Sequence, residues 1–116
     1  MNARNTVDAF RTAWEAKDFP TARGYLDDKL DFAGPIDRFD NADDYLQALT
    51  GLSQIVAGAT THHMFVDGDD VAVFYDLHTT TPAGTMPVAE WYHVRDGKIS
   101  AVRVYFDARP FTPPVA

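Results

Sequence analysis

Cysteine is absent from this sequence of 116 residues, and basic residues are few. Without cysteine the chain has no disulfide, no thiolate zinc site and no cysteine nucleophile, and a reducing cytoplasm is the simplest expected location. Ten Lys and Arg residues stand against seventeen Asp and Glu residues, which gives a net charge of −7. Nucleic acids and anionic membranes both attract basic surfaces, so we expect neither as a partner.

Several common motifs are also missing. No apolar run approaches the roughly 18 residues of a membrane span, and the stretch from Met1 to Thr6 lacks the apolar core of a signal peptide. The sequence contains no glycine-rich phosphate loop, no nucleophile elbow and no HExxH zinc motif. We therefore expect no cofactor.

Glutamate is scarce among the acidic residues. Fifteen of the seventeen are Asp, and the two glutamates are Glu15 and Glu90. Because Asp is common in turns and helix caps, local structure accounts for most of these carboxylates. Glu90 stands in the apolar run Pro87–Tyr92, where no turn or cap explains it.

The residues that are present describe one globular domain. Apolar residues make up 46% and charged residues 23%, which argues against disorder, and the length leaves no room for a second domain. We expect a single domain over residues 1–116, with a core over about residues 5–108 and a Pro-rich tail over residues 109–116.

Periodicity predicts helices in the first half and strands in the second. The first half is expected to hold a helix capped by Asn5 or Thr6, a short helix over Thr21–Leu26, a strand over Leu30–Ala33, and a helix from Asp40 or Asn41 to Gly58. The later strands are expected over Thr60–Val66, Val71–Thr80, Thr85–Val94 and Ile99–Asp107. This order predicts an α+β fold with helices packed on one sheet face.

Two segments near the end of the chain, Ala89–Ile99 and Arg103–Asp107, carry a family signature, and Ala13–Asp18, Tyr25–Asp28 and Gly34–Pro35 agree with it. In this order the sequence resembles the SnoaL-like proteins of the NTF2-like superfamily, which also contains ketosteroid isomerases, limonene-epoxide hydrolases and polyketide cyclases. The resemblance implies a cone in which a curved, mainly antiparallel sheet carries the three helices on its concave face. It also implies a pocket inside the cone and a homodimer through the outer sheet face.

Strand alternation assigns side chains to the pocket. Val102, Val104 and Phe106 form an uninterrupted apolar face, and the resemblance places Glu90 on the same inner face. A carboxylate in an apolar pocket suits a general acid or base. The alternative is a structural Glu90, hydrogen-bonded to a nearby His or Arg.

The strand over Val71–Thr80 offers two choices of inner face. The resemblance favours Ala72, Phe74, Asp76 and His78, although the opposite set of Val71, Val73, Tyr75 and Leu77 is more apolar. With the first choice, Asp76 and His78 form an acid/base pair beside Glu90. A dimer that covers the outer face would account for the apolar set there.

Adjacent strand residues point to opposite faces, so one of His62 and His63 at most can serve the pocket, and we expect His62. A metal site made of one of them, His78 and a carboxylate is not enforced by any spacing, so we expect no metal. The expected pocket walls are Phe10, Trp14, His62, Phe74, Tyr92, Val104 and Phe106.

Comparison with the superfamily's enzymes leaves the reaction open. Where ketosteroid isomerases have a helix tyrosine and an aspartate before a proline, this sequence has Phe10 and Ala33 or Gly34. The Asp-Arg-Asp triad of limonene-epoxide hydrolases also fails, because we expect no arginine on the inner face near Glu90. The single pocket aspartate of SnoaL-type cyclases could be matched by Asp76 or Glu90.

Two functions therefore remain as hypotheses. The first is an acid/base enzyme of isomerase, cyclase or hydratase type, in which Glu90, Asp76 and His78 act on a small apolar carbonyl or polyketide-like compound. The second is a non-catalytic ligand-binding or structural dimer module, in which the pocket is small and a fixed internal partner holds Glu90. In both, we expect the outer-face residues Trp91, His93, Arg103 and Tyr105 to form a homodimer interface.

Overall fold

The structure is a computed structural model, and it describes residues 2–111. Over these residues, helices alternate with strands in the first half and four long strands follow. The elements are α1 (Ala3–Glu15), α2 (Phe19–Arg23), β1 (Leu26–Ala33), β2 (Arg38–Phe39), α3 (Ala42–Leu52), η1 (Ser53–Ile55), β3 (Val56–Asp67), β4 (Asp70–Thr79), β5 (Thr85–Arg95), β6 (Lys98–Tyr105) and η2 (Arg109–Phe111). The expected α+β class is confirmed.

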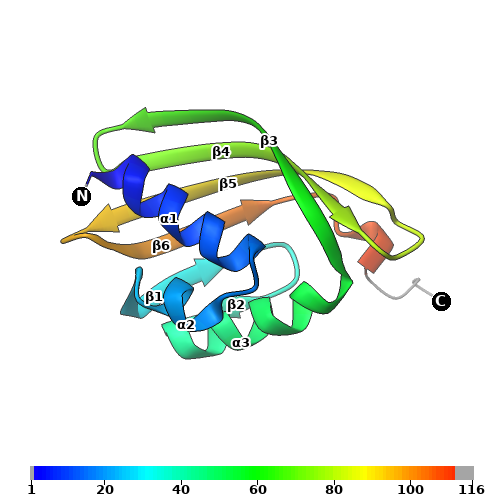
Figure 1. The fold of residues 1–116 in the computed structure, drawn as a ribbon, viewed down its shortest axis with the longest axis horizontal. Coiled ribbons are helices and arrows are strands. Elements are labelled where there is room, and N and C mark those ends of the chain that lie inside the picture. Colours follow the sequence, from blue (N-terminus) through cyan, green and yellow to red (C-terminus); the bar gives the residue numbers. More distant parts are fainter. Residues whose placement is uncertain (1, 112–116) are drawn as a thin grey trace.

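The strands form one curved sheet in the order β2-β1-β6-β5-β4-β3. Neighbouring strands are antiparallel except β1 and β6, which are parallel. The helices lie on one side of this sheet (Figure 1), with α1 against β3 to β6 and α3 against β1 and β2. We call this side of the sheet the inner face and the opposite side the outer face.

Cap residues set where the helices begin. The side chain of Asn2 accepts a hydrogen bond from the Asn5 backbone N–H, so α1 begins earlier than the expected cap at Asn5 or Thr6. Asn41 caps α3 in the same way, as predicted. The expected extension of this helix to Gly58 is wrong, because η1 follows α3 and β3 begins at Val56.

Two hairpin turns link the later strands where the sequence predicts them. Gly68 has a φ of 60°, and Asp96 and Gly97 have φ values of 53° and 75°. Positive φ at the first residue of a two-residue turn, as at Gly68, or at both, as at Asp96 and Gly97, twists the turn to match the strands it joins. These turns fix the register of β3 with β4 and of β5 with β6 near their tips.

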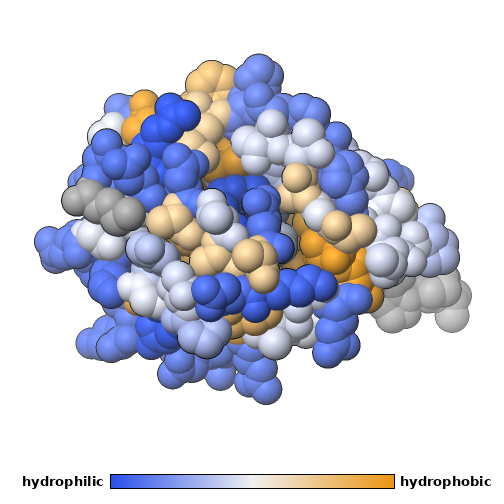
Figure 2. Space-filling view, viewed as in Figure 1, coloured by the Kyte–Doolittle hydropathy of each residue, from blue (hydrophilic) through white to orange (hydrophobic). Residues whose placement is uncertain are grey.

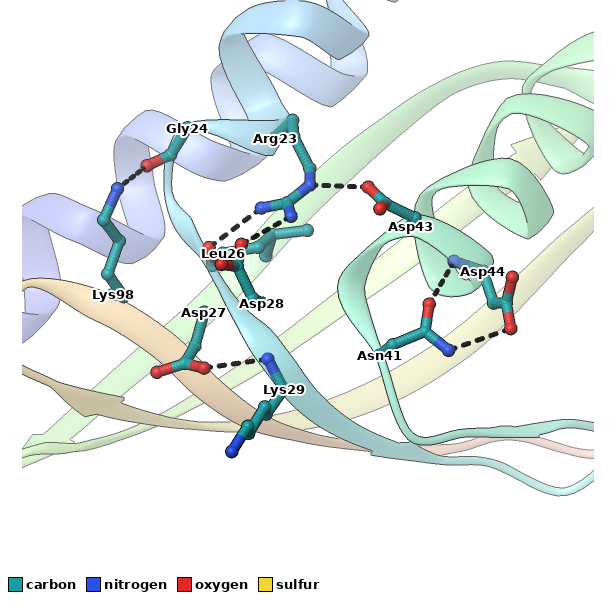
Figure 3. A network of polar contacts seen from close by, with 10 residues as sticks. All are labelled: Arg23, Gly24, Leu26, Asp27, Asp28, Lys29, Asn41, Asp43, Asp44 and Lys98. Atoms are coloured by element: carbon teal, nitrogen blue, oxygen red, sulfur yellow. Dashed lines mark hydrogen bonds and ion pairs between the residues drawn. The ribbon is translucent and has the colours of Figure 1, made fainter.

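Arg23 pairs with two of the aspartates and links three elements of the fold (Figure 3). Its guanidinium donates to Asp43 of α3 at 2.8 Å and to Asp28 of β1 at 2.7 Å, and it also donates to the Leu26 carbonyl. Asn41 and Asp44 exchange cap hydrogen bonds close by. These carboxylates cap and link elements, as the sequence predicts for most of the Asp residues.

The core lies between α1 and the inner face. Val7 and Phe10 of α1 meet Val71, Val73 and Tyr92 of the sheet, and all five are fully buried. On the side that carries the helices, hydrophilic residues cover most of the surface and hydrophobic ones show in separate areas (Figure 2). Of the expected Pro-rich tail, Arg109–Phe111 form η2, and residues 112–116 lie outside the described residues.

Candidate functional site

A pocket of about 190 Å³ lies between the inner face of the sheet and α3. Exposed Ile36 and Asp37 mark its mouth, and buried Tyr45, Tyr75 and Glu90 mark its inner end. Between them the wall is apolar. The wall includes Trp14, Phe32, Phe39, Leu49, Leu52, Leu77, Met86, Val88, Val104, Phe106 and Phe111.

Glu90 lines this pocket with a side chain that is 6% exposed. Its place on the inner face, expected from the family resemblance, is confirmed, because Val88 and Tyr92 on the same face are also buried. Tyr75 donates a hydrogen bond to Glu90 Oε1, and Tyr92 donates to Glu90 Oε2 at 2.8 Å. Both carboxylate oxygens therefore already have a donor.

Arg11 of α1 completes this cluster from the helix side. Its Nη1 lies 3.7 Å from Glu90 Oε1 and donates to the Tyr92 hydroxyl at 3.1 Å. The guanidinium also lies 4.2 Å from the centre of the Tyr75 ring, within cation–π distance. This arginine comes from a helix, whereas the expectation concerned only the inner face of the sheet and did not consider α1.

The electrostatics of the cluster fix the protonation of its two tyrosines and of Arg11. Burial, and then the charge of Glu90, raise the pKa of Tyr75 and of Tyr92 well above the usual value. Burial works to lower the pKa of Arg11, but Tyr92, Glu90 and Tyr75 outweigh it and raise that pKa. At neutral pH both tyrosines therefore stay protonated as donors and Arg11 stays charged.

The inner face of β4 is the opposite of the one expected. Val71, Val73, Tyr75 and Leu77 are all buried against the helices. Phe74, Asp76 and His78 therefore lie on the outer face, and Phe74 is 43% exposed there. Burial of apolar surface is favoured by about 25 cal/mol per Å². The strand therefore buries its more apolar set of side chains and not the set that the resemblance favoured.

The outer face also receives both histidines of the His62–His63 pair. The register of β3 with β4 shifts between Thr61 and His63, so His62 is the extra residue of a β-bulge. His62 Nε2 then lies 2.9 Å from Asp76 Oδ2, and His63 lies opposite Phe74. The expectation that His62 faces the pocket is wrong, because simple alternation fails at a bulge.

His78, expected beside Glu90, also bonds elsewhere. Its two ring nitrogens lie 2.8 Å from the hydroxyls of Thr60 and Thr85. Within the described residues, no group of three His, Asp or Glu side chains is placed to hold a metal ion. Nor does any helix in residues 2–111 have the length and apolar content needed to cross a membrane.

The remaining expected wall residues divide into two groups. Trp14, Val104 and Phe106 line the pocket. Phe10 and Tyr92 are fully buried behind it, where Phe10 packs against Tyr45 and Tyr92. Their contact with a ligand stays a prediction.

Sequence reasoning missed Arg11, Tyr75 and Tyr45 as site residues. Arg11 follows Phe10 and stands four residues after Val7, so it falls on the buried stripe of α1, and this placement is a signal that could have found it. Tyr75 belongs to the apolar set of β4 that the resemblance set aside. The sequence predicts Tyr45 as a core residue of α3, but no pattern in it indicates that the Tyr45 side chain lines the pocket.

The SnoaL-like domain family matches residues 7–102, and the chain belongs to this family. A protein from Kribbella flavida DSM 17836 is 32% identical with a TM-score of 0.86, over 92% of this chain and 88% of that one. An NTF2-like protein of unknown function from Cytophaga hutchinsonii is 28% identical with a TM-score of 0.84, over 96% and 95% of the chains. An LEH-like epoxide hydrolase of M. tuberculosis is 24% identical with a TM-score of 0.79, over 91% and 83%, and this likeness shows the fold alone.

A comparison with curated proteins finds no match. The NTF2-like fold expected from the sequence is confirmed. Function must be argued from the pocket itself, because one fold can carry many activities.

Proposed function

We propose that this protein binds a small, mainly apolar molecule in the pocket between α3 and the inner face. The apolar wall that ends in a cluster of polar groups carries this proposal, because such a wall binds the body of a ligand and a few polar groups orient it. The volume of about 190 Å³ is below the roughly 300–1,000 Å³ typical of sites for drug-sized ligands. The ligand is therefore small.

The surroundings of Glu90 favour binding over catalysis. A catalytic carboxylate must exchange a proton with its substrate. Here Tyr75, Tyr92 and Arg11 hold the Glu90 side chain, and Asp76 and His78 lie on the outer face. A small pocket and a fixed internal partner are what the binding hypothesis expects.

Acid/base catalysis by Glu90 alone is the second candidate, supported by the contact of its carboxylate with the pocket. Under this hypothesis, Glu90→Gln abolishes any turnover of a small carbonyl compound. Glu15→Gln is the matched control, because Glu15 also lies near Arg11, at 3.8 Å, but outside this pocket. Equal turnover by the two variants would exclude Glu90 as the acid or base.

Trp14 provides a direct reporter of binding. The chain has two tryptophans, so Trp91→Phe leaves Trp14 in the pocket wall as the single emitter. Titration with the neutral bicyclic hydrocarbon tetralin should change Trp14 emission and saturate. Ala48→Phe, which fills the pocket from α3, should abolish the change, whereas Gln47→Phe on the exposed side of the same helix should not. Saturable binding that persists unchanged in Ala48→Phe would contradict the proposal.

We also propose a homodimer through the outer face. Phe65, Phe74 and Tyr105 are 60%, 43% and 62% exposed there, and strand pairing carries this aromatic area from β3 across β4 and β5 to β6. The expected interface residues Trp91 and Arg103 lie opposite each other on the same face. Exposed aromatic side chains beside arginine are typical of protein interfaces.

A further inference from the structure

The Tyr45 hydroxyl is an unused polar group in the pocket wall. Tyr45 is 3% exposed, and its ring packs against Phe32 at 4.7 Å and Phe10 at 6.4 Å between ring centres. Among the described residues, its hydroxyl has no hydrogen-bond partner. In the part of the chain that the structure describes, Arg11 Nη2 is the fully buried side-chain atom without a hydrogen-bond partner, and the Tyr45 hydroxyl is not such an atom. The hydroxyl is therefore open to the pocket that Tyr45 lines, where it can bond to a partner from outside the chain.

The hydroxyls of the neighbouring tyrosines already donate hydrogen bonds within the protein. Tyr75 and Tyr92 both donate to Glu90, and Arg11 Nη1 donates to Tyr92. Burial, and then the charge of Glu90, raise the pKa of Tyr45 well above its usual value, so its hydroxyl keeps its proton. At the inner end of the pocket, Tyr45 is therefore the tyrosine with a proton still to donate.

The pocket also selects against negative charge. Asp37 and Glu90 line it, and the described lining residues include no Lys, Arg or His. Arg11 is buried behind the Tyr75 ring and is already paired with Glu90. A ligand carboxylate or phosphate would lose its hydration here without gaining a cation.

We propose that Tyr45 is a ligand-binding residue whose hydroxyl donates a hydrogen bond to the oxygen of a neutral carbonyl compound. This inference rests on the proposed binding function of the pocket. It assigns the apolar body of the ligand to the wall around Leu49, Leu77 and Val104, and the ligand oxygen to the inner end. Trp14 also has an indole N–H in the wall, but its ring borders a second hollow beside Lys17 and Gly58 as well.

Two matched compounds test this role. α-Tetralone and tetralin share one bicyclic skeleton, in which a carbonyl replaces a methylene group. Calorimetric titration of the wild-type protein should show α-tetralone binding about fivefold more tightly, as expected for one net hydrogen bond. In Tyr45→Phe this preference should vanish while the affinity for tetralin stays the same. Tyr25→Phe, outside the pocket, should keep the preference.

The outcomes separate the two proposals. Equal affinities for the two compounds in the wild type, or a preference that survives in Tyr45→Phe, would overturn the role of Tyr45 and leave the binding pocket standing. Failure of both compounds to bind would overturn the binding function and the role of Tyr45 with it. Because Tyr45→Phe removes a hydroxyl without a partner and keeps the ring, its melting temperature should not fall, which guards against a folding artefact.

The carboxylic acid built on the tetralin skeleton tests the charge argument. It should bind at least about tenfold more weakly than α-tetralone at neutral pH, since none of the described lining residues is a cation that could compensate its charge. An acid that binds as tightly as the ketone would overturn the assignment of a neutral ligand.

Discussion

Arg11 and Glu90 connect a helix to a strand through a charge pair that is almost wholly buried. Their side chains are 5% and 6% exposed, and the closest nitrogen and oxygen atoms are 3.7 Å apart. Arg4 and Asp8 on α1 make a pair of nearly the same length, 3.8 Å, with more than half of each side chain exposed. A comparison of the two pairs therefore measures how burial changes the contribution of an ion pair to stability at nearly the same distance.

Arg11→Met should lower the free energy of unfolding by about 3 kcal/mol, because it leaves Glu90 as a buried charge without its cation. Arg4→Met should change it by less than about 1 kcal/mol, as for other exposed pairs. Urea denaturation of the two variants measures both values. Equal losses would show that the buried pair does not hold α1 against the sheet.

The buried tyrosines predict a loss of stability in alkali. The pKa values of Tyr45, Tyr75 and Tyr92 are raised by burial from a usual value of 10.0. Above about pH 10 the unfolded chain releases protons that these three residues retain in the native state, so the free energy of unfolding falls as the pH rises. Urea denaturation between about pH 7 and pH 11 should show a plateau and then this fall, which should be smaller in Tyr75→Phe. A free energy of unfolding that stays constant up to pH 11 would contradict the burial argument.

Glu90 could be placed from the sequence, but the cluster around it could not. A lone Glu in an apolar strand, with buried residues two positions away on either side, has to face the core. One partner, Tyr92, lies two residues away on the same strand. The other two come from β4 and α1, at sequence separations of 15 residues for Tyr75 and 79 for Arg11 counted from their positions 75, 11 and 90. No local pattern reports contacts over such distances.

Among the elements, β4 and the bulge in β3 set which groups can reach the pocket. The more apolar set of β4 is buried, so the hydrophobic pattern alone predicts its inner face correctly and the resemblance does not. The bulge at His62 has no signal in the sequence, because a single inserted residue looks like ordinary strand. Together these two features move Asp76, His78 and His62 to the outer face.

At the end of β1, the backbone of Gly34 lies very close to a side chain of β6. A Cβ added at Gly34 would lie 2.6 Å from Val104 Cγ1 of β6, whereas one added at Gly51 of α3 would meet nothing within 4 Å. Gly34→Ala should therefore destabilise the protein by about 1–3 kcal/mol through overpacking. Gly51→Ala should stabilise it by about 0.5–1 kcal/mol, because alanine favours the helix. Thermal unfolding of both variants checks the signs, and a stabilising Gly34→Ala would contradict the close packing of β1 on β6.

At the scale of the whole molecule, the two faces of the sheet form two different surfaces. The inner face and α3 form the pocket, and the outer face exposes aromatic side chains on β3, β4 and β6. The sequence predicts this division through the family resemblance, which covers nearly the whole chain. It predicts neither the ligand nor the reaction, because these depend on a few side chains that come together only in the fold.

The proposed dimer makes a prediction for sedimentation. Phe74→Ser on the outer face should shift the protein from dimer to monomer, because it removes an exposed aromatic side chain from the interface. Ile36→Ser is the matched control, since Ile36 is similarly exposed, at 49%, but lies at the mouth of the pocket. A wild-type protein that sediments as a monomer would contradict the dimer.

The crystal structure of a complex with α-tetralone tests the central claim most directly. The ring system should lie between α3 and the inner face of the sheet, with the carbonyl oxygen within about 3 Å of the Tyr45 hydroxyl, as a hydrogen bond requires. Density for the compound on the outer face, or in the pocket with its oxygen turned away from Tyr45 toward the mouth, would contradict the account.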